Sequence, residues 1–84
     1  MRETTLLEVM AEVSQCTNAA VANGADARSA DDLVGEIVDD AEEALEASGD
    51  SRRRALIRAA SFAILALHAH DAEAAKEIQN DDHG

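Results

Sequence analysis

Residues 55–69 read A-L-I-R-A-A-S-F-A-I-L-A-L-H-A, and they are the strongest indication of the fold class. Its fifteen residues carry one charge, Arg58, and no proline interrupts them. A helix of this composition is apolar nearly all round, and such a helix is normally surrounded by other helices. We therefore expect a long helix over about 51–79 at the centre of a helical bundle.

Two shorter amphipathic helices are predicted to precede this segment. The first should span about 5–22, because Thr5 and Glu8 form a T-x-x-E capping box and apolar residues then recur at helical spacing. The second should span about 30–47, with Ser29 as its N-cap. The apolar residues of each helix fall on one face, as in helices that pack against a core.

Glycines mark the turns between the three helices. Gly24 is expected to end the first helix, and Gly49 to end the second in a left-handed conformation. Asp50 or Ser51 is the expected cap of the third helix. Because both connections are short, we expect consecutive helices to be antiparallel neighbours.

Residues 1–84 are predicted to form one all-α domain, a three-helix antiparallel unit with a long C-terminal helix and a frayed tail at 80–84. Its core lacks bulk, since 19 of the 39 hydrophobic residues are alanine and 17 are Leu, Ile, Val or Phe. A chain of this size is near the lower limit for a self-sufficient core. We therefore expect self-association into a helical bundle, as a dimer or tetramer. The predicted interface residues are Leu56, Ile57, Ala60, Phe62, Ile64 and Leu67.

The chain is strongly acidic, with 18 acidic and 7 basic residues and a formal net charge of -11. Phosphate contacts need Lys and Arg on one face, so direct nucleic-acid binding is not expected. No apolar run reaches the ~20 residues that span a bilayer, and no signal-peptide pattern opens the chain. The single cysteine, Cys16, suits a reducing compartment and is predicted to lie in the core. These features predict a cytoplasmic protein without a membrane partner.

Acidic residues are concentrated on the second predicted helix, where residues 31–46 hold eight acids and no base. Several recur at spacings of three or four and so share one helical face. Carboxylates arranged in this way can hold Mg²⁺ for phosphate chemistry, but they are more often a solvated acidic face. The candidate metal ligands are Asp32, Glu36, Asp39, Asp40 and Glu43.

Four of the seven basic residues cluster at the start of the third predicted helix, where the helix dipole disfavours cations. A partner is therefore expected to compensate them. It is either internal, from Glu42, Glu43 and Glu46 across the turn, or external, as a phosphate or an acidic protein surface. The candidate binding residues are Arg52, Arg53, Arg54 and Arg58.

The stretch L-V-G-E-I-V-D-D-A-E-E-A-L at 33–45, the G-D turn at 49–50 and A-L-I-R-A-A-S-F-A-I-L-A-L at 55–67 follow one another at a recognisable spacing. This order resembles the MazG-like, all-α nucleoside triphosphate pyrophosphohydrolases. The resemblance covers about residues 5–72 and rests largely on the apolar pattern. It implies an all-α fold assembled as a dimer or tetramer, as in small phage-encoded members of that family.

The resemblance also implies a Mg²⁺ site built from an E-x-x-E motif on one helix and an E-x-x-D motif on the next. Glu36 matches the second Glu of the first motif, whereas Leu33 stands at the first. In the second motif, Ala55 replaces the Glu and Arg58 replaces the Asp. A guanidinium group cannot ligate a metal and repels one. The resemblance therefore implies a degenerate member without catalysis, in which Arg58 with Arg54 contacts phosphate directly.

Three functions are compatible with these patterns. The favoured hypothesis is a non-catalytic, self-associating helical protein on a MazG-like scaffold, which binds a nucleotide or a protein partner and needs no cofactor. The second is an acidic decoy or adaptor, such as a phage-encoded inhibitor, that binds a basic protein surface. The third is an Mg²⁺-dependent pyrophosphohydrolase that uses the carboxylates of the second helix in an altered register.

Overall fold

The computed structural model describes the backbone of residues 4–81 and the side chains of residues 4–76. This part of the chain is all-helical, as predicted. The predicted tail at 80–84 lies partly outside the described residues, and its first two residues continue the last helix. The elements are α1 (Leu6–Ala22), the short 3₁₀ helix η1 (Ala25–Ala27), α2 (Ala30–Glu46) and α3 (Gly49–Asp81).

Side-chain caps fix the starts of the first two α-helices. The Glu8 backbone N–H donates to Thr5 Oγ1 at 3.1 Å, and the Asp32 N–H donates to Ser29 Oγ at 3.2 Å. Both cap residues have extended backbones, with ψ near 160°. The Thr5 hydroxyl also donates to Glu8 Oε1 at 3.3 Å. The two predicted N-caps are confirmed, because capping depends on residues within one helical turn.

The two inter-helix turns use glycine in the left-handed region. Gly24 has φ +90° and Gly49 has φ +59°. The predicted caps of α3, Asp50 and Ser51, are wrong, because the helix begins at Gly49 and both residues lie in its first turn. The Ser48 carbonyl, directly before Gly49, accepts from the Arg52 N–H at 3.4 Å, so helical hydrogen bonding begins immediately at the turn.

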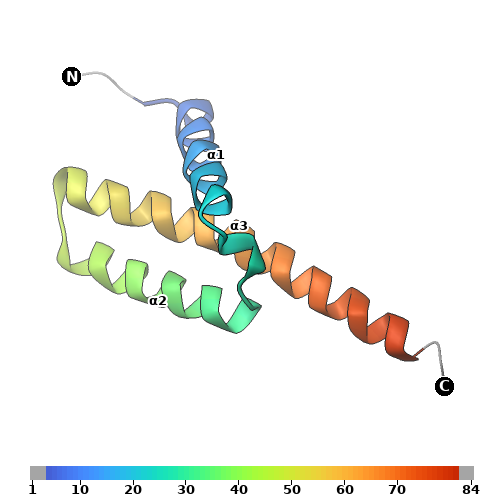
Figure 1. Ribbon diagram of the computed structural model, residues 1–84. Helices are drawn as coiled ribbons and strands as arrows, with labels where there is room; N and C mark the ends of the chain where they lie inside the picture. Colours follow the sequence, from blue (N-terminus) through green and yellow to red (C-terminus); the bar gives the residue numbers. More distant parts are fainter. Residues whose placement is uncertain (1–3, 82–84) are drawn as a thin grey trace.

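The helices form an open arrangement around α3 (Figure 1). α2 runs antiparallel to the first half of α3 and makes the main helix–helix contact. α1 crosses α3 near its middle, and α3 continues beyond both neighbours only after Glu73, whose carboxylate accepts from the Ala30 backbone N–H at 3.0 Å. The short turn between α2 and α3 enforces their antiparallel packing, as predicted. The prediction that α1 and α2 are antiparallel neighbours is wrong, because η1 separates them and α1 instead crosses α3.

The core is small and consists mostly of alanine. Leu33 and Leu65 are its two large buried side chains in the described residues, and Phe62 and Ile37 pack against it while remaining half-buried. α1 contributes no buried residue. The buried apolar residues are Ala25, Leu33, Ala44, Ala55, Leu65, Ala66 and Ala69.

The molecule is extended for its size. Its radius of gyration is 15.5 Å, compared with about 12 Å for a compact domain of this length. It exposes 6211 Å², whereas a compact monomer of this mass exposes about 4,800 Å². The excess surface includes apolar side chains on all three α-helices, among them Met10, Val38 and Leu56.

Candidate functional site

The crossing of α1 over α3 leaves a hollow on each side of α1. The first, called here the arginine pocket, has a volume of about 520 Å³, within the range of small-molecule sites. The second, called here the apolar groove, consists of two adjoining hollows of about 390 and 250 Å³. The arginine pocket is lined by Cys16, Ala19, Ala20, Asn23, Gly24, Ala25, Arg28, Arg58, Ser61 and Phe62. The apolar groove is lined by Val9, Met10, Val13, Ser14, Thr17, Asn18, Arg53, Leu56, Ile57, Ala60 and Ile64.

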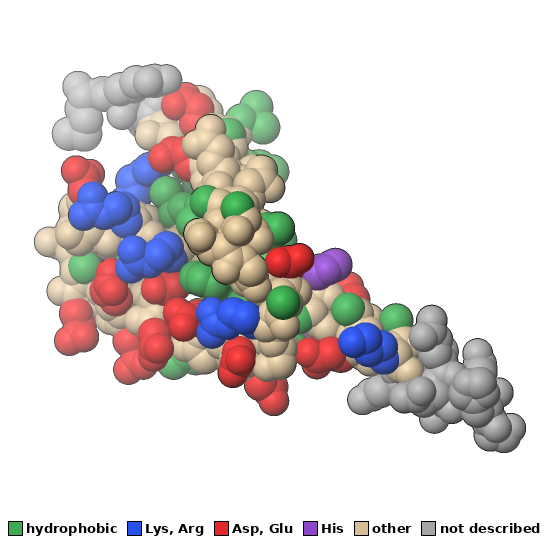
Figure 2. Space-filling model, viewed as in Figure 1, with side chains coloured by type: hydrophobic (Ala, Val, Ile, Leu, Met, Phe, Trp, Pro, Cys, Tyr) green, Lys and Arg blue, Asp and Glu red, His purple; other side chains and the backbone are tan. Residues whose placement is uncertain are grey.

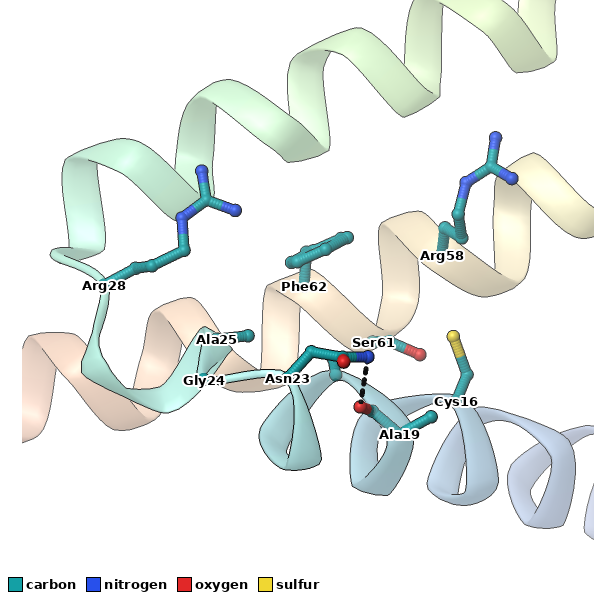
Figure 3. A pocket seen from close by; sticks show the side chains of 10 residues that line it. Cys16, Ala19, Asn23, Gly24, Ala25, Arg28, Arg58, Ser61 and Phe62 are labelled. Carbon is teal, nitrogen blue, oxygen red and sulfur yellow. Dashed lines mark hydrogen bonds between the residues drawn. The ribbon is translucent and has the colours of Figure 1, made fainter.

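The arginine pocket is a trough over α3, bounded by the C-terminal part of α1 and by η1 with its flanking connections (Figure 3). Phe62 lies in the middle of the trough, and Arg28 and Arg58 extend along the α2 side at opposite ends. Cys16 projects from α1 into the space opposite Arg58. The Asn23 side-chain NH₂ group donates a hydrogen bond to the Ala19 carbonyl at 3.0 Å. The pocket thus combines small apolar walls, one aromatic ring and two guanidinium groups.

Arg28 is held loosely. Its Nη2 donates to Glu36 Oε1 at 3.4 Å and to the Asp32 carbonyl at 3.5 Å, both near the upper limit for hydrogen bonds. The side chains of Arg28 and Glu36 are 36 % and 40 % exposed. An exposed ion pair with such long contacts contributes little stability. Arg28 can therefore exchange Glu36 for another anion at small cost.

Arg58 is held more firmly at the other end of the pocket. Its Nε donates to Asp40 Oδ1 at 3.3 Å and its Nη2 to Glu43 Oε2 at 2.7 Å. Hydrogen bonding to Asp40 is the main cause that raises the pKa of Arg58; desolvation opposes it, and Glu43 adds to it. Asp40 is only 7 % exposed, and its second oxygen, Oδ2, is buried without a hydrogen-bond partner. Arg58 thus compensates the charge of the buried Asp40 carboxylate.

Two polar contacts attach α1 to α3. Arg53 donates through Nη1 to Glu12 Oε1 at 2.8 Å and through Nη2 to Glu12 Oε2, which makes a two-pronged ion pair. This hydrogen bonding lowers the pKa of Glu12 and raises that of Arg53. The buried Ser61 hydroxyl donates toward the carbonyls of Val13 and Ile57, at 3.2 and 3.0 Å. These polar contacts join α1 to α3 beside its half-buried apolar residues, such as Val13 and Ala20.

The four arginines predicted as one cluster have different surroundings. Arg58 faces α2, Arg53 faces α1, and Arg52 and Arg54 are exposed. Successive helical positions are rotated by about 100°, so neighbouring arginines point in different directions. Of the predicted internal partners, Glu43 pairs with Arg58.

Arg28 was missed by the sequence reasoning. It lies in a connection, and connections lack the periodicity that places helical side chains on a face. The available signal was its position four residues before Asp32 and eight before Glu36, because the chain leading into a helix can reach the first turns of that helix. It is also the one basic residue between Asn23 and Glu46.

The five candidate metal ligands are divided among different environments. Glu36 contacts Arg28, Asp40 and Glu43 contact Arg58, and Asp32 and Asp39 are exposed. Charges of opposite sign thus already occupy three of the five carboxylates (Figure 2 shows acidic and basic side chains interspersed over α2 and the first half of α3). Among the described residues, no three Asp, Glu, His or Cys side chains converge to hold a metal ion.

The positions that the MazG-like resemblance assigns to metal ligands can be compared with this geometry. Leu33 and Ala55, which stand where the family has glutamates, are fully buried between α2 and α3. Arg58, which stands at the position of the family's aspartate, is committed to acids of α2. These residues do not fit an Mg²⁺ site.

The predicted interface residues lie on more than one face of α3. Leu56, Ile57, Ala60 and Ile64 line the apolar groove, and Leu67 is exposed one turn further on. Phe62 instead packs against the core and lines the arginine pocket. It follows Leu56 by six residues, which places it about 240° around the helix. The apolar composition of residues 55–69 concealed this division, because both faces carry large apolar side chains.

No known family profile matches the chain, and neither a curated protein nor a solved structure is significantly similar to it. Within residues 4–81, no helix is both long enough and apolar enough to cross a bilayer. The functional interpretation therefore depends on the two hollows beside α1 and on the charges around them.

Proposed function

We propose that the protein is a non-catalytic helical protein that functions as a homo-oligomer, with the apolar groove and the adjoining face of α3 as its assembly surface. The observation that carries this proposal is the exposure of large apolar side chains along that surface. Met10 is 58 % exposed, Leu56 and Ile64 are each 51 % exposed, and Leu67 is 62 % exposed. Contiguous apolar surface of this kind marks interaction sites in soluble proteins.

A second copy of the chain is the occupant that best fits this surface. Leu56, Ala60, Ile64 and Leu67 recur at spacings of four, four and three, so they form one stripe along α3. Two such stripes can pair across a two-fold axis, because each presents the same residues to the other. Ala60 would allow close approach of the helices, and Arg53 at the edge is already paired with Glu12.

The area argument agrees with this occupant. The chain exposes 6211 Å², about 1,400 Å² more than a compact monomer of its mass. A stable interface buries about 800 Å² on each partner. One interface therefore accounts for part of the excess. A second stripe on α2, formed by the exposed Val34, Val38, Ala41 and Leu45, could supply the remainder in a tetramer.

The MazG-like scaffold remains part of this proposal. Its support is the antiparallel α2–α3 pair, together with Arg58 at the position of a metal-binding aspartate and opposite Asp40 and Glu43. In such a degenerate member, direct contacts from Arg58 and Arg54 would replace the metal in holding a nucleotide. Calorimetric titration with ATP in the absence of Mg²⁺ tests this ligand, and binding that Arg58→Ala leaves unchanged would remove Arg58 from it.

The assembly itself is tested by measuring mass in solution. We expect a dimer or tetramer at micromolar concentration by analytical ultracentrifugation, and a folded monomer for Ile64→Glu. The matched control is Leu45→Glu, which adds the same charge at a more exposed apolar residue of α2 and should leave at least the dimer intact. A wild-type chain that stays monomeric, or equal disruption by both variants, would contradict the proposal.

One observation favours the acidic adaptor as a second candidate. A shallow hollow near the C-terminal end of α2 is surrounded by four acidic residues, Asp39, Glu42, Glu43 and Glu46. Their charges add to a negative potential there. Such a surface would attract a basic protein segment. An oligolysine peptide should then bind at low salt, and replacing Glu42 and Glu46 with Gln should weaken this binding. Without binding at low salt, this candidate fails.

A further inference from the structure

The arginine pocket is separate from the proposed assembly surface. It lies on the other side of α1, and no residue lines both hollows. Its ten lining residues come from α1, α3, η1 and the connections that flank η1. Clefts between helices are common places for small-molecule sites. We propose that this pocket binds a short organic dicarboxylate, with one carboxylate on Arg28, the other on Arg58, and the carbon skeleton across Phe62.

The positions of the two guanidinium groups set the length of this ligand. Arg28 contacts the Asp32 carbonyl and Glu36, whereas Arg58 contacts Asp40 and Glu43. The midpoints of these two pairs are separated by about two helical turns of α2, or about 11 Å. A carboxylate hydrogen-bonded to each guanidinium occupies part of that distance at either end. A chain of a few carbons, or one ring, fills the remainder.

The lining between the arginines selects an apolar skeleton. Phe62 is half-buried on the floor, and Ala19, Ala20 and Ala25 form small apolar walls beside it. These side chains offer no hydrogen bonds to a polar middle section. A compound with acids only at its ends therefore fits better than inorganic diphosphate, whose charge is continuous and whose phosphorus atoms are too close together to reach both arginines.

Both guanidinium groups also have N–H groups that their hydrogen bonds to α2 do not use. The hydrogen bonds of Arg28 use Nη2 alone, and those of Arg58 leave Nη1 unused. Glu36 is 40 % exposed and can turn to solvent when a ligand carboxylate takes its place on Arg28. Arg58 can keep its bonds to Asp40 and Glu43 and use its remaining N–H groups. The ligand thus displaces one weak surface ion pair and leaves the buried carboxylate compensated.

The test uses ¹⁵N-labelled full-length protein titrated with succinate, terephthalate, benzoate and inorganic diphosphate. Ionic strength is held near ~0.3 M, because the protein's charge of -11 repels anions and salt shortens that repulsion. We expect saturable amide shifts at Ala20, Gly24 and Phe62 with a dicarboxylate. Benzoate, which carries a single carboxylate, should bind about tenfold more weakly, the cost of losing one charged hydrogen bond. Absence of saturable shifts with both dicarboxylates, or tighter binding of diphosphate, would overturn the proposal.

Two arginine variants and one lysine control assign the contacts. Arg28→Gln and Arg58→Gln should each weaken dicarboxylate binding by about tenfold or more. Lys76→Gln makes the same charge change at an exposed position of α3 outside the pocket, and should change binding less than twofold. Should Arg58→Gln lower helicity by circular dichroism, Arg28→Gln decides alone, since its contacts are at the surface. Equal loss of binding in Arg28→Gln and Lys76→Gln would mean that net charge, not the pocket, attracts the anion.

This inference goes beyond the nucleotide proposal, with which it shares only Arg58, and it does not depend on self-association. Ile64→Glu lies in the apolar groove and should leave dicarboxylate binding intact even where it abolishes the oligomer. Loss of binding in that variant would overturn the separation of the two surfaces. The mass measurements can therefore contradict the assembly proposal, and the titrations the dicarboxylate proposal, independently of each other.

Discussion

Asp40 is the buried charged side chain among the described residues. It is a carboxylate at the α2–α3 interface, 7 % exposed, with one oxygen bonded to Arg58 and the other unpartnered. A buried charge is costly unless a partner compensates it. The sequence placed Asp40 among candidate metal ligands because it shares the acidic pattern of α2. Its burial depends on the packing of α3 against that helix, which spacing along one helix cannot reveal.

Removing Arg58 should therefore destabilise the fold more than removing a surface arginine. We expect Arg58→Met to lower the free energy of unfolding by about 2 kcal/mol, less than for a fully buried pair because Arg58 is partly exposed. Arg54→Met, the exposed control one turn away, should change it by less than about 0.5 kcal/mol. In an Asp40→Leu background, Arg58→Met should cost much less. Urea unfolding measures all these chains, and equal costs of Arg58→Met in both backgrounds would show that the pair is not coupled.

Glu12 gives a pH-dependent contribution at the same scale. Hydrogen bonding to Arg53 lowers the pKa of Glu12 below its ordinary value of 4.5. A carboxyl group whose pKa is lower in the folded state stabilises that state above the unfolded pKa, and this contribution is lost as the pH falls through the folded pKa. The difference in free energy of unfolding between wild type and Glu12→Gln should thus have its largest value near pH 6 and decrease below about pH 4.5. Because the other carboxyl groups titrate in both chains, a difference that stays constant down to pH 3 would contradict the contribution of this pair.

At the scale of helices, local signals were reliable and non-local ones were not. Thr5 and Ser29 were identified as caps because each bonds a backbone N–H three residues away. The start of α3 was misplaced by two residues, since the competing candidates all lie within one turn of Gly49. The contact of Arg28 with Glu36 was missed because it requires knowing how the connection after η1 folds back. Caps could be read from the sequence, whereas the composition of the arginine pocket could not.

Two glycines should respond oppositely to the same substitution. Gly35 lies inside α2 and is exposed, and an added Cβ would meet no neighbouring atom within 4 Å, so Gly35→Ala should stabilise the protein by about 0.5–1 kcal/mol. Gly49 has φ +59°, where a side chain is strained, and Gly49→Ala should destabilise it by about 1 kcal/mol. Thermal unfolding of both variants measures the two signs. A stabilising Gly49→Ala would show that the α2–α3 turn does not need the left-handed conformation.

For the molecule as a whole, the shortage of large apolar residues and their exposure are linked. Of the 17 Leu, Ile, Val and Phe side chains in the sequence, Leu33 and Leu65 are the buried ones in the described residues. Composition alone predicted that the core would be incomplete, and the extended shape around α3 agrees with that prediction. Composition could not indicate which faces stay open, because that depends on the angle at which α1 crosses α3. Assembly through those faces remains a prediction.

The net charge of -11 gives this assembly a distinctive salt dependence. Two copies repel each other over distances that salt shortens, from about 30 Å at 0.01 M to about 3 Å at 1 M. The apolar groove offers no free charge for an ion pair between copies, since its Arg53 is already paired with Glu12 within the chain. We therefore expect the dissociation constant of the oligomer to fall severalfold between low and high salt, as measured by sedimentation at several protein concentrations. Binding of a basic partner to the acids of α2 would show the opposite trend, so an oligomer that dissociates as salt is added would show that ion pairs rather than the apolar face hold the copies together.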